Sequence, residues 1–199
     1  MTFASIPKKK LINNINYKIL KNKYFKKDNF ELSSISLEDI EKIRKWRNEQ
    51  IRNLRQGKKI TKKEQLKYFK NYIFSEYPNK KPKNIIFSIK VNSNLIGYGG
   101  LVHISWINFR AEVSLVMETE IENNKKKKFI YFKIFLDLIK KLAFHDMKLK
   151  KLTTETYSFR KKEINFIERY GFMREGILKE NIYVKRKFFD SYLHAINFK

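Results

Sequence analysis

Hydrophobic positions recur along this chain with two different periods, one typical of strands and the other of helices. Alternating or β-branched runs predict strands at 30–35, 85–91, 95–104, 110–117, 152–157, 177–184 and 188–198. Apolar residues spaced by three or four predict helices at 36–46, 61–74, 129–144 and 163–170. The predicted order is therefore strand, two helices, three antiparallel strands, helix, strand, short helix and hairpin.

Three of the helices carry end signals of their own. Ser36 is followed three residues later by Asp39, and Thr61 by Glu64, a spacing that predicts N-terminal capping. Gly171 follows the short helix, where a left-handed residue commonly ends a helix.

The predicted connections indicate the fold class. A helix joins strands 110–117 and 152–157, so we expect these strands to be parallel neighbours with a right-handed crossover. The sequence thus predicts an α/β (α+β) fold with a mixed, mostly antiparallel sheet and helices on both faces. Residues 1–28 are basic and weakly patterned, and we expect an extension that adds an edge strand to a domain over 29–199.

The composition supports one folded domain and narrows the chemistry. The 199 residues are 42% hydrophobic, which is enough for a core despite the charge. The lack of cysteine excludes disulfides and thiolate ligands, and we predict no metal site. No signal peptide and no run of roughly 18 apolar residues is present, so we expect a soluble cytoplasmic protein.

The net charge is strongly positive. With 45 Lys and Arg against 20 Asp and Glu, the chain carries +25, which attracts RNA, phosphorylated small molecules or anionic lipid. Only nine of the basic residues are Arg, and the abundance of Lys, Asn and Ile fits an AT-rich genome equally well. A functional basic surface and a compositional background both remain open.

Several motifs resemble the GCN5-related N-acetyltransferase (GNAT) superfamily. They are KWRN (45–48), LIGYGGLVHI (95–104), AEVSLVM (111–117), LAFHDMKLKKLTTETY (142–157) and FIERYGFMREGILKENIYVKRKFFDSYLHAI (166–196). The last motif and the W-R-N after the first helix are similar to the branch that modifies ribosomal proteins and amino sugars. The resemblance covers about residues 30–197 and implies a sheet whose two central parallel strands splay apart.

The resemblance further implies that acetyl-CoA, or another acyl-CoA, lies between the splayed strands. Parted strands leave backbone groups unpaired, and these can bond the amides of the pantetheine arm. An N–H near the end of strand 110–117 can hold the thioester carbonyl as its oxygen gains charge. We expect the backbone of Val116, Met117 and Glu118 to make these contacts.

The chain departs from the family at the loop that holds the pyrophosphate. The family has glycines there that expose backbone N–H groups, whereas residues 122–132 contain none. Lys125, Lys126, Lys127 and Lys128 are predicted to replace them as point charges on the pyrophosphate or the 3′-phosphate. The alternative is that the loop has lost tight CoA binding and the lysines are merely solvated.

The proton donor to the leaving thiolate also differs. Many relatives place a tyrosine where this chain has Ile167. Tyr157 is the nearest substitute, with Tyr170 behind it, although either can be a packing aromatic. Arg160 and Glu163 stand where relatives carry Asn and Ser facing the cofactor, and Arg160 is predicted to contact a phosphate or to be a surface residue.

Three residues are candidates for the base that deprotonates the acceptor amine. Glu112 and Glu155 lie within apolar strands, where burial raises the pKa of a carboxyl. His103 ends the Gly-rich strand, and an imidazole titrates in a useful range. The alternative for each is a structural role, in which Glu112 or Glu155 pairs with a neighbouring lysine and His103 lies at a strand edge.

The acceptor is expected between the first two helices, the loop 52–59 and the strand end near Trp106. Its predicted contacts are Arg47, Asn48, Arg52, Arg55 and Trp106.

The leading hypothesis is an acyl-CoA-dependent N-acetyltransferase that acts by direct attack on a primary amine. The favoured acceptor is an amino sugar or nucleotide-linked amino sugar, and a protein N-terminus is next. The alternative is a catalytically silent GNAT-like module that binds RNA, the ribosome or a protein partner. The sequence leaves the oligomeric state open, and a homodimer is the one assembly considered.

Overall fold

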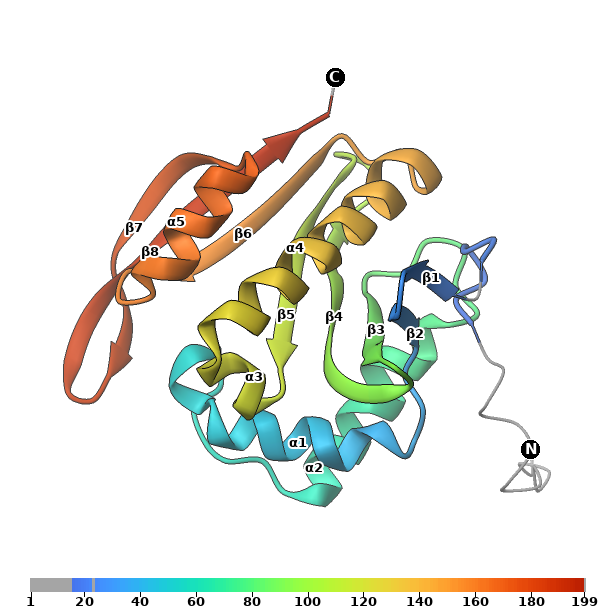
Figure 1. Ribbon diagram of the computed structural model, residues 1–199, viewed down its shortest axis with the longest axis horizontal. Helices are drawn as coiled ribbons and strands as arrows, with labels where there is room; N and C mark the ends of the chain where they lie inside the picture. Colours follow the sequence, from blue (N-terminus) through green and yellow to red (C-terminus); the bar gives the residue numbers. More distant parts are fainter. Residues whose placement is uncertain (1–15, 23, 199) are drawn as a thin grey trace.

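The computed structural model describes residues 16–22 and 24–198, which form one eight-stranded sheet covered by helices (Figure 1). The strand order is β1-β2-β3-β4-β5-β6-β8-β7, and β5 and β6 are the parallel pair in it. The strands are β1 (Tyr24–Lys27), β2 (Phe30–Ser34), β3 (Ile85–Val91), β4 (Asn94–Ser105), β5 (Arg110–Met117), β6 (Lys151–Tyr157), β7 (Met173–Val184) and β8 (Lys187–Asn197). The predicted mixed, mostly antiparallel sheet is confirmed.

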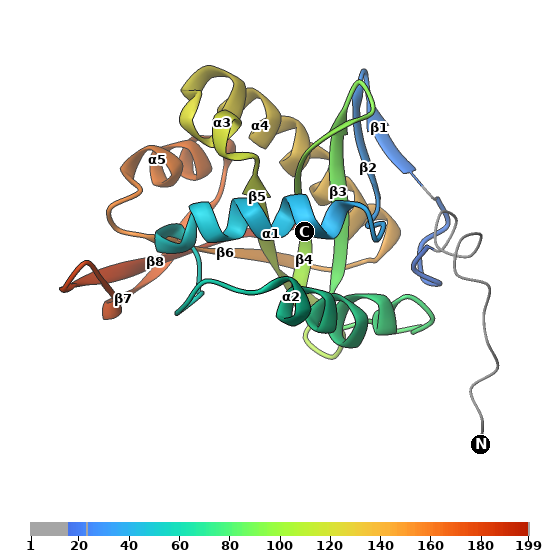
Figure 2. The ribbon, with the colours of Figure 1, turned by 90° about the horizontal axis from the view of Figure 1, so that it is seen from below.

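Helices lie on both faces of this sheet. They are α1 (Asp39–Glu49), α2 (Lys62–Tyr68), α3 (Thr119–Asn123), α4 (Lys125–Lys141) and α5 (Lys161–Tyr170), and shorter 3-10 or π turns cover Ile51–Asn53, Phe69–Ile73, Phe74–Glu76 and Leu142–Asp146. In Figure 2, α3, α4 and α5 cover one face, α2 lies on the opposite face, and α1 crosses the ends of the central strands. None of the described helices is long and apolar enough to cross a membrane.

A glycine lets the central helix approach the middle of the sheet. Phe135 of α4 is fully buried against β4 and β5. A Cβ added to Gly99 would lie 2.4 Å from the carbonyl oxygen of Ser114 and 3.1 Å from Phe135 Cζ. Only a residue without a side chain therefore fits at this crossing.

The described part of the N-terminal extension packs onto the sheet. Tyr17 is 1% exposed, and its hydroxyl accepts a hydrogen bond from the amide of Ile86 at 2.9 Å. Strand β1 pairs with β2 along its whole length and is the edge strand expected of the extension. Residues 1–15 of the predicted extension lie outside the described residues.

Some helix starts differ from the predicted ones. Helix α1 begins at Asp39, but the Asp39 carboxylate accepts from the amide of Ser36 at 2.9 Å, which is one half of the predicted capping, and also from the Ser88 hydroxyl at 2.6 Å. The capping box of Thr61 and Glu64 is confirmed at the start of α2.

The segment before α4 holds the largest local difference. Helix α4 starts at Lys125, four residues before the predicted start, and the Asn124 side chain caps it by accepting from the amide of Lys127 at 3.1 Å. Helix α3 occupies a segment expected to be a polar loop. The positively charged segment is therefore a helix N-terminus rather than an open loop.

Candidate active site

Strands β5 and β6 separate after a short parallel contact. They pair at three positions, the last being Glu112 with Thr153. Beyond that point β5 continues to Met117 beside β4, and β6 continues to Tyr157 beside β8. We call the opening between them, visible in Figure 1, the splay. It is the divergence of the central parallel pair that the resemblance predicted.

The backbone of β5 determines which residues face the splay. The amide of Glu118 donates to the carbonyl of Ile96 on β4 at 2.8 Å. Bonded residues alternate in a regular antiparallel pair, so the backbone of Val116 also bonds to β4. A Cβ on Gly97 would accordingly lie 2.8 Å from the Val116 carbonyl oxygen. The prediction that the backbone groups of Val116 and Glu118 contact acyl-CoA is therefore wrong.

Leu115 and Met117 present their backbone groups to the splay instead. The Thr153 hydroxyl of β6 donates to the carbonyl of Ala111 at 3.3 Å, which shows that the odd-numbered residues of β5 face β6. The Met117 carbonyl accepts from Gln50 Nε2 at 2.7 Å. In the part of the chain that the structure describes, its N–H and both backbone groups of Leu115 are left for a ligand in the splay.

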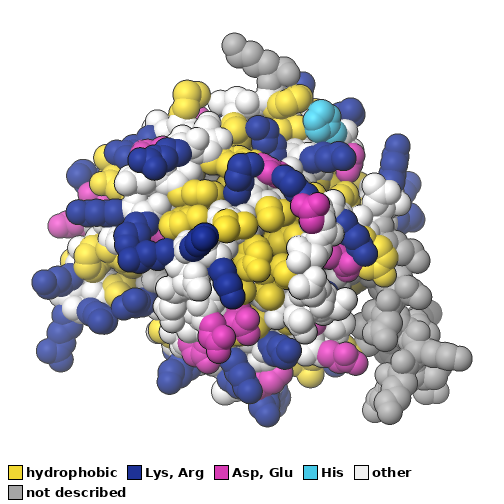
Figure 3. Space-filling view, in the orientation of Figure 1, with side chains coloured by type: hydrophobic (Ala, Val, Ile, Leu, Met, Phe, Trp, Pro, Cys, Tyr) yellow, Lys and Arg dark blue, Asp and Glu magenta, His cyan; other side chains and the backbone are white. Residues whose placement is uncertain are grey.

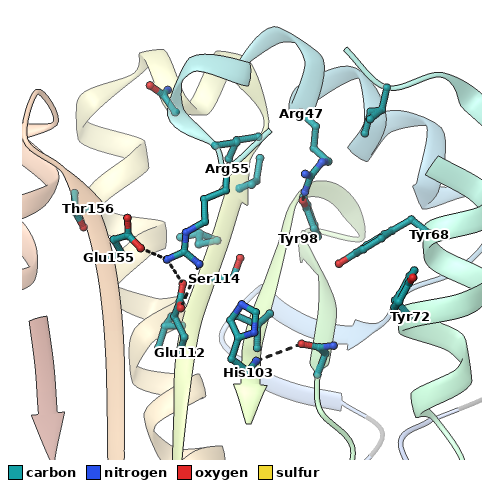
Figure 4. Close-up of a pocket in the computed structure, with 18 of the residues that line it drawn as sticks. Arg47, Arg55, Tyr68, Tyr72, Tyr98, His103, Glu112, Ser114, Glu155 and Thr156 are labelled. Carbon is teal, nitrogen blue, oxygen red and sulfur yellow. Dashed lines mark hydrogen bonds and ion pairs between the residues drawn. The ribbon is translucent and has the colours of Figure 1, made fainter. Parts of the chain in front are cut away.

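A cavity of about 910 Å³ opens on the α2 side of the splay (Figure 4). We call it the acceptor cavity. Arg47 enters it from α1 and donates to the Tyr98 hydroxyl at 2.6 Å and to Gln56 Oε1 at 3.0 Å. Within the described residues Arg47 forms no ion pair, so its charge is available to an anionic group in the cavity.

Arg55 bridges the two splayed strands inside this cavity. Its Nη2 lies 3.0 Å from Glu112 Oε1 on β5 and also contacts Glu155 Oε2 on β6 (Figure 4). Burial opposes the charge on Arg55, but the two carboxylates outweigh it and raise the pKa of the guanidinium. Asn181 donates to the other oxygen of Glu155 at 3.0 Å. Both predicted carboxylate bases are thus already engaged by a cation.

Two polar side chains in the acceptor cavity lack partners among the described residues. Tyr157 is 5% exposed and its hydroxyl makes no hydrogen bond there. Burial, with a smaller effect of the Glu155 charge, raises the pKa of Tyr157, so the hydroxyl stays protonated at neutral pH. The His103 ring likewise makes no hydrogen bond, while its backbone amide donates to Asn84 Oδ1 at 3.3 Å. The Tyr157 hydroxyl can give a proton, and a neutral imidazole such as that of His103 can accept one.

A narrower slot of about 90 Å³ lies on the opposite side of the splay, against α4 and α5. We call it the inner slot. It shares residues of both strands and the start of α5 with the acceptor cavity, so the two spaces meet across the splay: Val113, Leu115, Glu155, Thr156 and Arg160. The hydroxyl of Thr154 in its wall is buried without a partner in the described structure. Ile167 also lines the slot, where relatives carry a tyrosine.

The inner slot leads into an outer groove of about 690 Å³ between α4, α5 and the β7–β8 hairpin. Basic side chains dominate its lining: Arg52, Lys125, Lys128, Arg160, Lys162, Lys185 and Lys187. The neighbouring Lys125 ammonium lowers the pKa of Lys162, a repulsion that a bound anion would relieve. Figure 3 shows Lys and Arg side chains gathered at this hairpin end of the molecule.

The other predicted contacts divide between these spaces and the surface. Lys126 and Lys127 are exposed and do not line the groove, because they lie on the outer side of the first turn of α4. Arg52 lines the outer groove rather than the acceptor cavity. Trp106 lines neither the outer groove nor the acceptor cavity, and its indole N–H donates to the carbonyl of Pro82 at 2.9 Å. The predicted phosphate contacts of Lys126 and Lys127 and the predicted acceptor contacts of Arg52 and Trp106 are corrected accordingly.

Asn48 holds the loop that follows α1 by hydrogen bonds to its backbone. Its Oδ1 accepts from the amide of Ile60 at 2.9 Å and its Nδ2 donates to the Ile60 carbonyl at 2.9 Å. It therefore fixes the loop that carries Arg55 and does not line the acceptor cavity.

Among the residues of the acceptor cavity that the sequence analysis missed are Glu64, Tyr68, Tyr72 and Tyr98. Tyr68 and Tyr72 lie one helical turn apart with ring centroids 5.5 Å from each other. Their spacing of four beside an apolar stripe was the signal available in the sequence.

Comparison with known proteins identifies the family. A family description, the acetyltransferase (GNAT) domain, matches residues 32–193. The chain belongs to the GNAT acetyltransferase family. It is accordingly an acyl-CoA-dependent N-acetyltransferase, and the family implies acetyl-CoA as the cosubstrate. The match does not distinguish the amino-sugar branch from others.

Solved structures of GNAT acetyltransferases share this fold. Spermidine N-acetyltransferase from Vibrio cholerae, solved with CoA and spermine, has a TM-score of 0.73 and 19% identity, covering 86% of this chain and 96% of that one. A dodecameric structure of the same enzyme has a TM-score of 0.72 and 18% identity, covering 86% and 95%. No curated protein sequence matches.

The residues present fit the cosubstrate that the GNAT family implies. Unpaired backbone groups of Leu115 and the orphaned Thr154 hydroxyl face the splay, where a polar arm would satisfy them. The outer groove carries seven basic and two acidic side chains, which suits a polyanionic end.

Proposed function

We propose that this GNAT enzyme transfers an acetyl group from acetyl-CoA to a primary amine on a neutral or anionic small molecule. An amino sugar or nucleotide-linked amino sugar is the proposed acceptor. The observation that carries the proposal is the pair of spaces on opposite sides of β5, which share Val113 and Leu115. The donor enters from the basic outer groove and the amine from the acceptor cavity.

The charge of the acceptor cavity supports this substrate class. Its lining contains four permanently basic side chains and three carboxylates, but one of the four, Arg160, is itself paired with Glu122 and Glu163. Two of the carboxylates, Glu112 and Glu155, are already paired with Arg55. Arg47 has only neutral partners in the described structure. A phosphate or other anionic group on the acceptor would supply the missing counter-charge.

The side chains can carry the proton transfers of direct attack. The backbone N–H of Leu115 or Met117 donates to the thioester carbonyl, whose oxygen gains charge as the amine attacks. His103, whose ring has no partner in the described structure, accepts the ammonium proton directly or through water. The new C–N bond forms as the C–S bond breaks, and Tyr157 gives its proton to the departing sulfur.

A polyamine is the second candidate acceptor. The solved enzyme with spermine is a spermidine N-acetyltransferase, and the cavity here contains Glu64 as well as Glu112 and Glu155. A polycation could bind Glu112 and Glu155 only if it displaced the Arg55 guanidinium, and Glu64 already pairs with Lys58 at 3.0 Å. The existing cation therefore favours the neutral or anionic acceptor.

An acceptor panel tests the proposal. Purified protein is incubated with acetyl-CoA and either a nucleotide-linked amino sugar, spermidine or a short peptide, and CoA release and product mass are measured. We expect the highest kcat/KM with the amino sugar, and a KM for it about tenfold higher in Arg47→Met.

Each result has one interpretation. A higher kcat/KM with spermidine would replace the proposed acceptor with a polyamine. The peptide as best acceptor would indicate protein N-terminal acetylation. No turnover, no acetyl-CoA thermal shift and salt-sensitive RNA binding would together support the catalytically silent module.

A further inference from the structure

Four charged side chains meet where α3, α4 and α5 come together. The Lys128 ammonium lies 2.7 Å from Glu122 Oε1 and also contacts Glu163 Oε1. Arg160 Nη2 lies 3.0 Å from Glu122 Oε1 and 3.6 Å from Glu163 Oε1. Each cation contacts both carboxylates, so the group is closed and balanced in charge. We call it the ionic cluster.

The ionic cluster separates the outer groove from the inner slot. All four of its residues line both spaces. The side chain of Lys128 is 8% exposed, and those of Glu122 and Glu163 are each 14% exposed. A molecule whose charged end lies in the groove and whose arm reaches the splay must pass these side chains.

The charges of the cluster can be exchanged for those of a ligand. Burial opposes ionisation of Glu163, but Arg160 and Lys128 outweigh it and hold its pKa below the ordinary value. The oxygens of a diphosphate offer both cations equivalent partners, so they remain paired when they switch from carboxylate to phosphate. The two carboxylates would then lie beside like charges and oppose binding.

We propose that the ionic cluster is an internal gate on the donor site, in which Glu122 and Glu163 compete with the donor's diphosphate for Lys128 and Arg160. This inference rests on the proposed function, which assigns the groove and slot to acyl-CoA. The gate makes entry depend on the anionic end of the donor, because an uncharged arm alone cannot replace the carboxylates.

A purely structural clamp would show the same contacts in the unliganded protein. The ion pairs join α4 to α5 through Lys128 and Glu163, and α3 to the start of α5 through Glu122 and Arg160. The two roles differ in their effect on CoA binding. Neutralising a carboxylate of a clamp loosens the site and weakens binding, whereas neutralising a competitor strengthens it.

Calorimetric titration with CoA distinguishes them without turnover. We expect Glu163→Gln and Glu122→Gln to bind CoA about tenfold more tightly than the wild type, equivalent to about 1.4 kcal/mol. Lys128→Met should bind it about tenfold more weakly. Glu31→Gln is the matched control, because it removes the same charge from the pair that Glu31 of β2 forms with Lys26 of β1, far along the sheet.

The outcomes separate the gate from the proposed function. Tighter binding by the Gln variants supports the gate, as does binding by these variants alone when the wild type shows none. Unchanged or weaker binding by the Gln variants, with measurable wild-type binding, overturns the gate and leaves the proposed function intact. Absence of CoA binding in every variant, each checked for folding by its melting temperature, overturns both.

Discussion

Replacing Tyr157 by Phe should lower turnover without lowering stability. The hydroxyl is buried without a hydrogen-bond partner in the described structure, so its removal breaks no intramolecular bond. Relief of an unsatisfied buried hydroxyl stabilises the fold by about 1 kcal/mol. For a chain of this size that corresponds to a rise in Tm of about 2–4 °C. Loss of the proton donor should lower kcat by about 100-fold, the lower end for general acids.

Tyr170→Phe provides the matched control for this variant. The Tyr170 hydroxyl donates to Asp137 Oδ1 at 2.8 Å, and it lines neither the inner slot nor the acceptor cavity. Its removal should cost about 1 kcal/mol of stability and leave kcat unchanged. Removal of the hydroxyl should thus raise the stability of the fold at Tyr157 and lower it at Tyr170.

Two measurements decide the prediction. Thermal unfolding gives the two changes in Tm, and steady-state assays with saturating acetyl-CoA and the best acceptor give kcat. An unchanged kcat in Tyr157→Phe would refute the role in protonating the leaving sulfur. A fall in Tm as large as in Tyr170→Phe would show that Tyr157 has a structural partner.

Two further predictions concern stability. Gly99→Ala should destabilise the protein by about 1–3 kcal/mol in urea unfolding, because its Cβ would lie 2.4 Å from the Ser114 carbonyl oxygen, whereas Gly57→Ala meets nothing within 4 Å and should be neutral. Burial raises the pKa of Tyr17 and Tyr77 above 10.0, so the unfolded chain loses these protons first and stability should fall above about pH 10. Equal stability of the two glycine variants, or unchanged unfolding midpoints from pH 9 to 11, would contradict these arguments.

The sheet was predictable because its signals are local. The alternating runs of β3 to β6 and the apolar stripe of α4 each identify an element without knowledge of its neighbours. The connection of β5 to β6 through one helix then implies a parallel pair. The residue at which that pair separates, Glu112, depends on how β8 holds β6 and has no local signal.

The site was only partly predictable for the same reason. The register of β5 with β4 decides which residues of β5 turn their backbone groups toward the splay. The sequence alone could not show that Leu115 does so and Val116 does not. Glu112 and Glu155 were found as carboxylates in apolar strands, but their shared partner Arg55 is distant in the chain. The ionic cluster likewise joins residues from three helical segments.

Strand β6 is held in the sheet by β8, a strand that comes much later in the sequence. All seven of its residues, Lys151 to Tyr157, pair with β8, which begins only at Lys187. The hairpin also supplies Lys185 and Lys187 to the outer groove. During synthesis, β6 therefore has no antiparallel partner until residues 187–197 have left the ribosome. A chain that stops before residue 187 therefore lacks both the partner strand of β6 and one of the lysines of the outer groove.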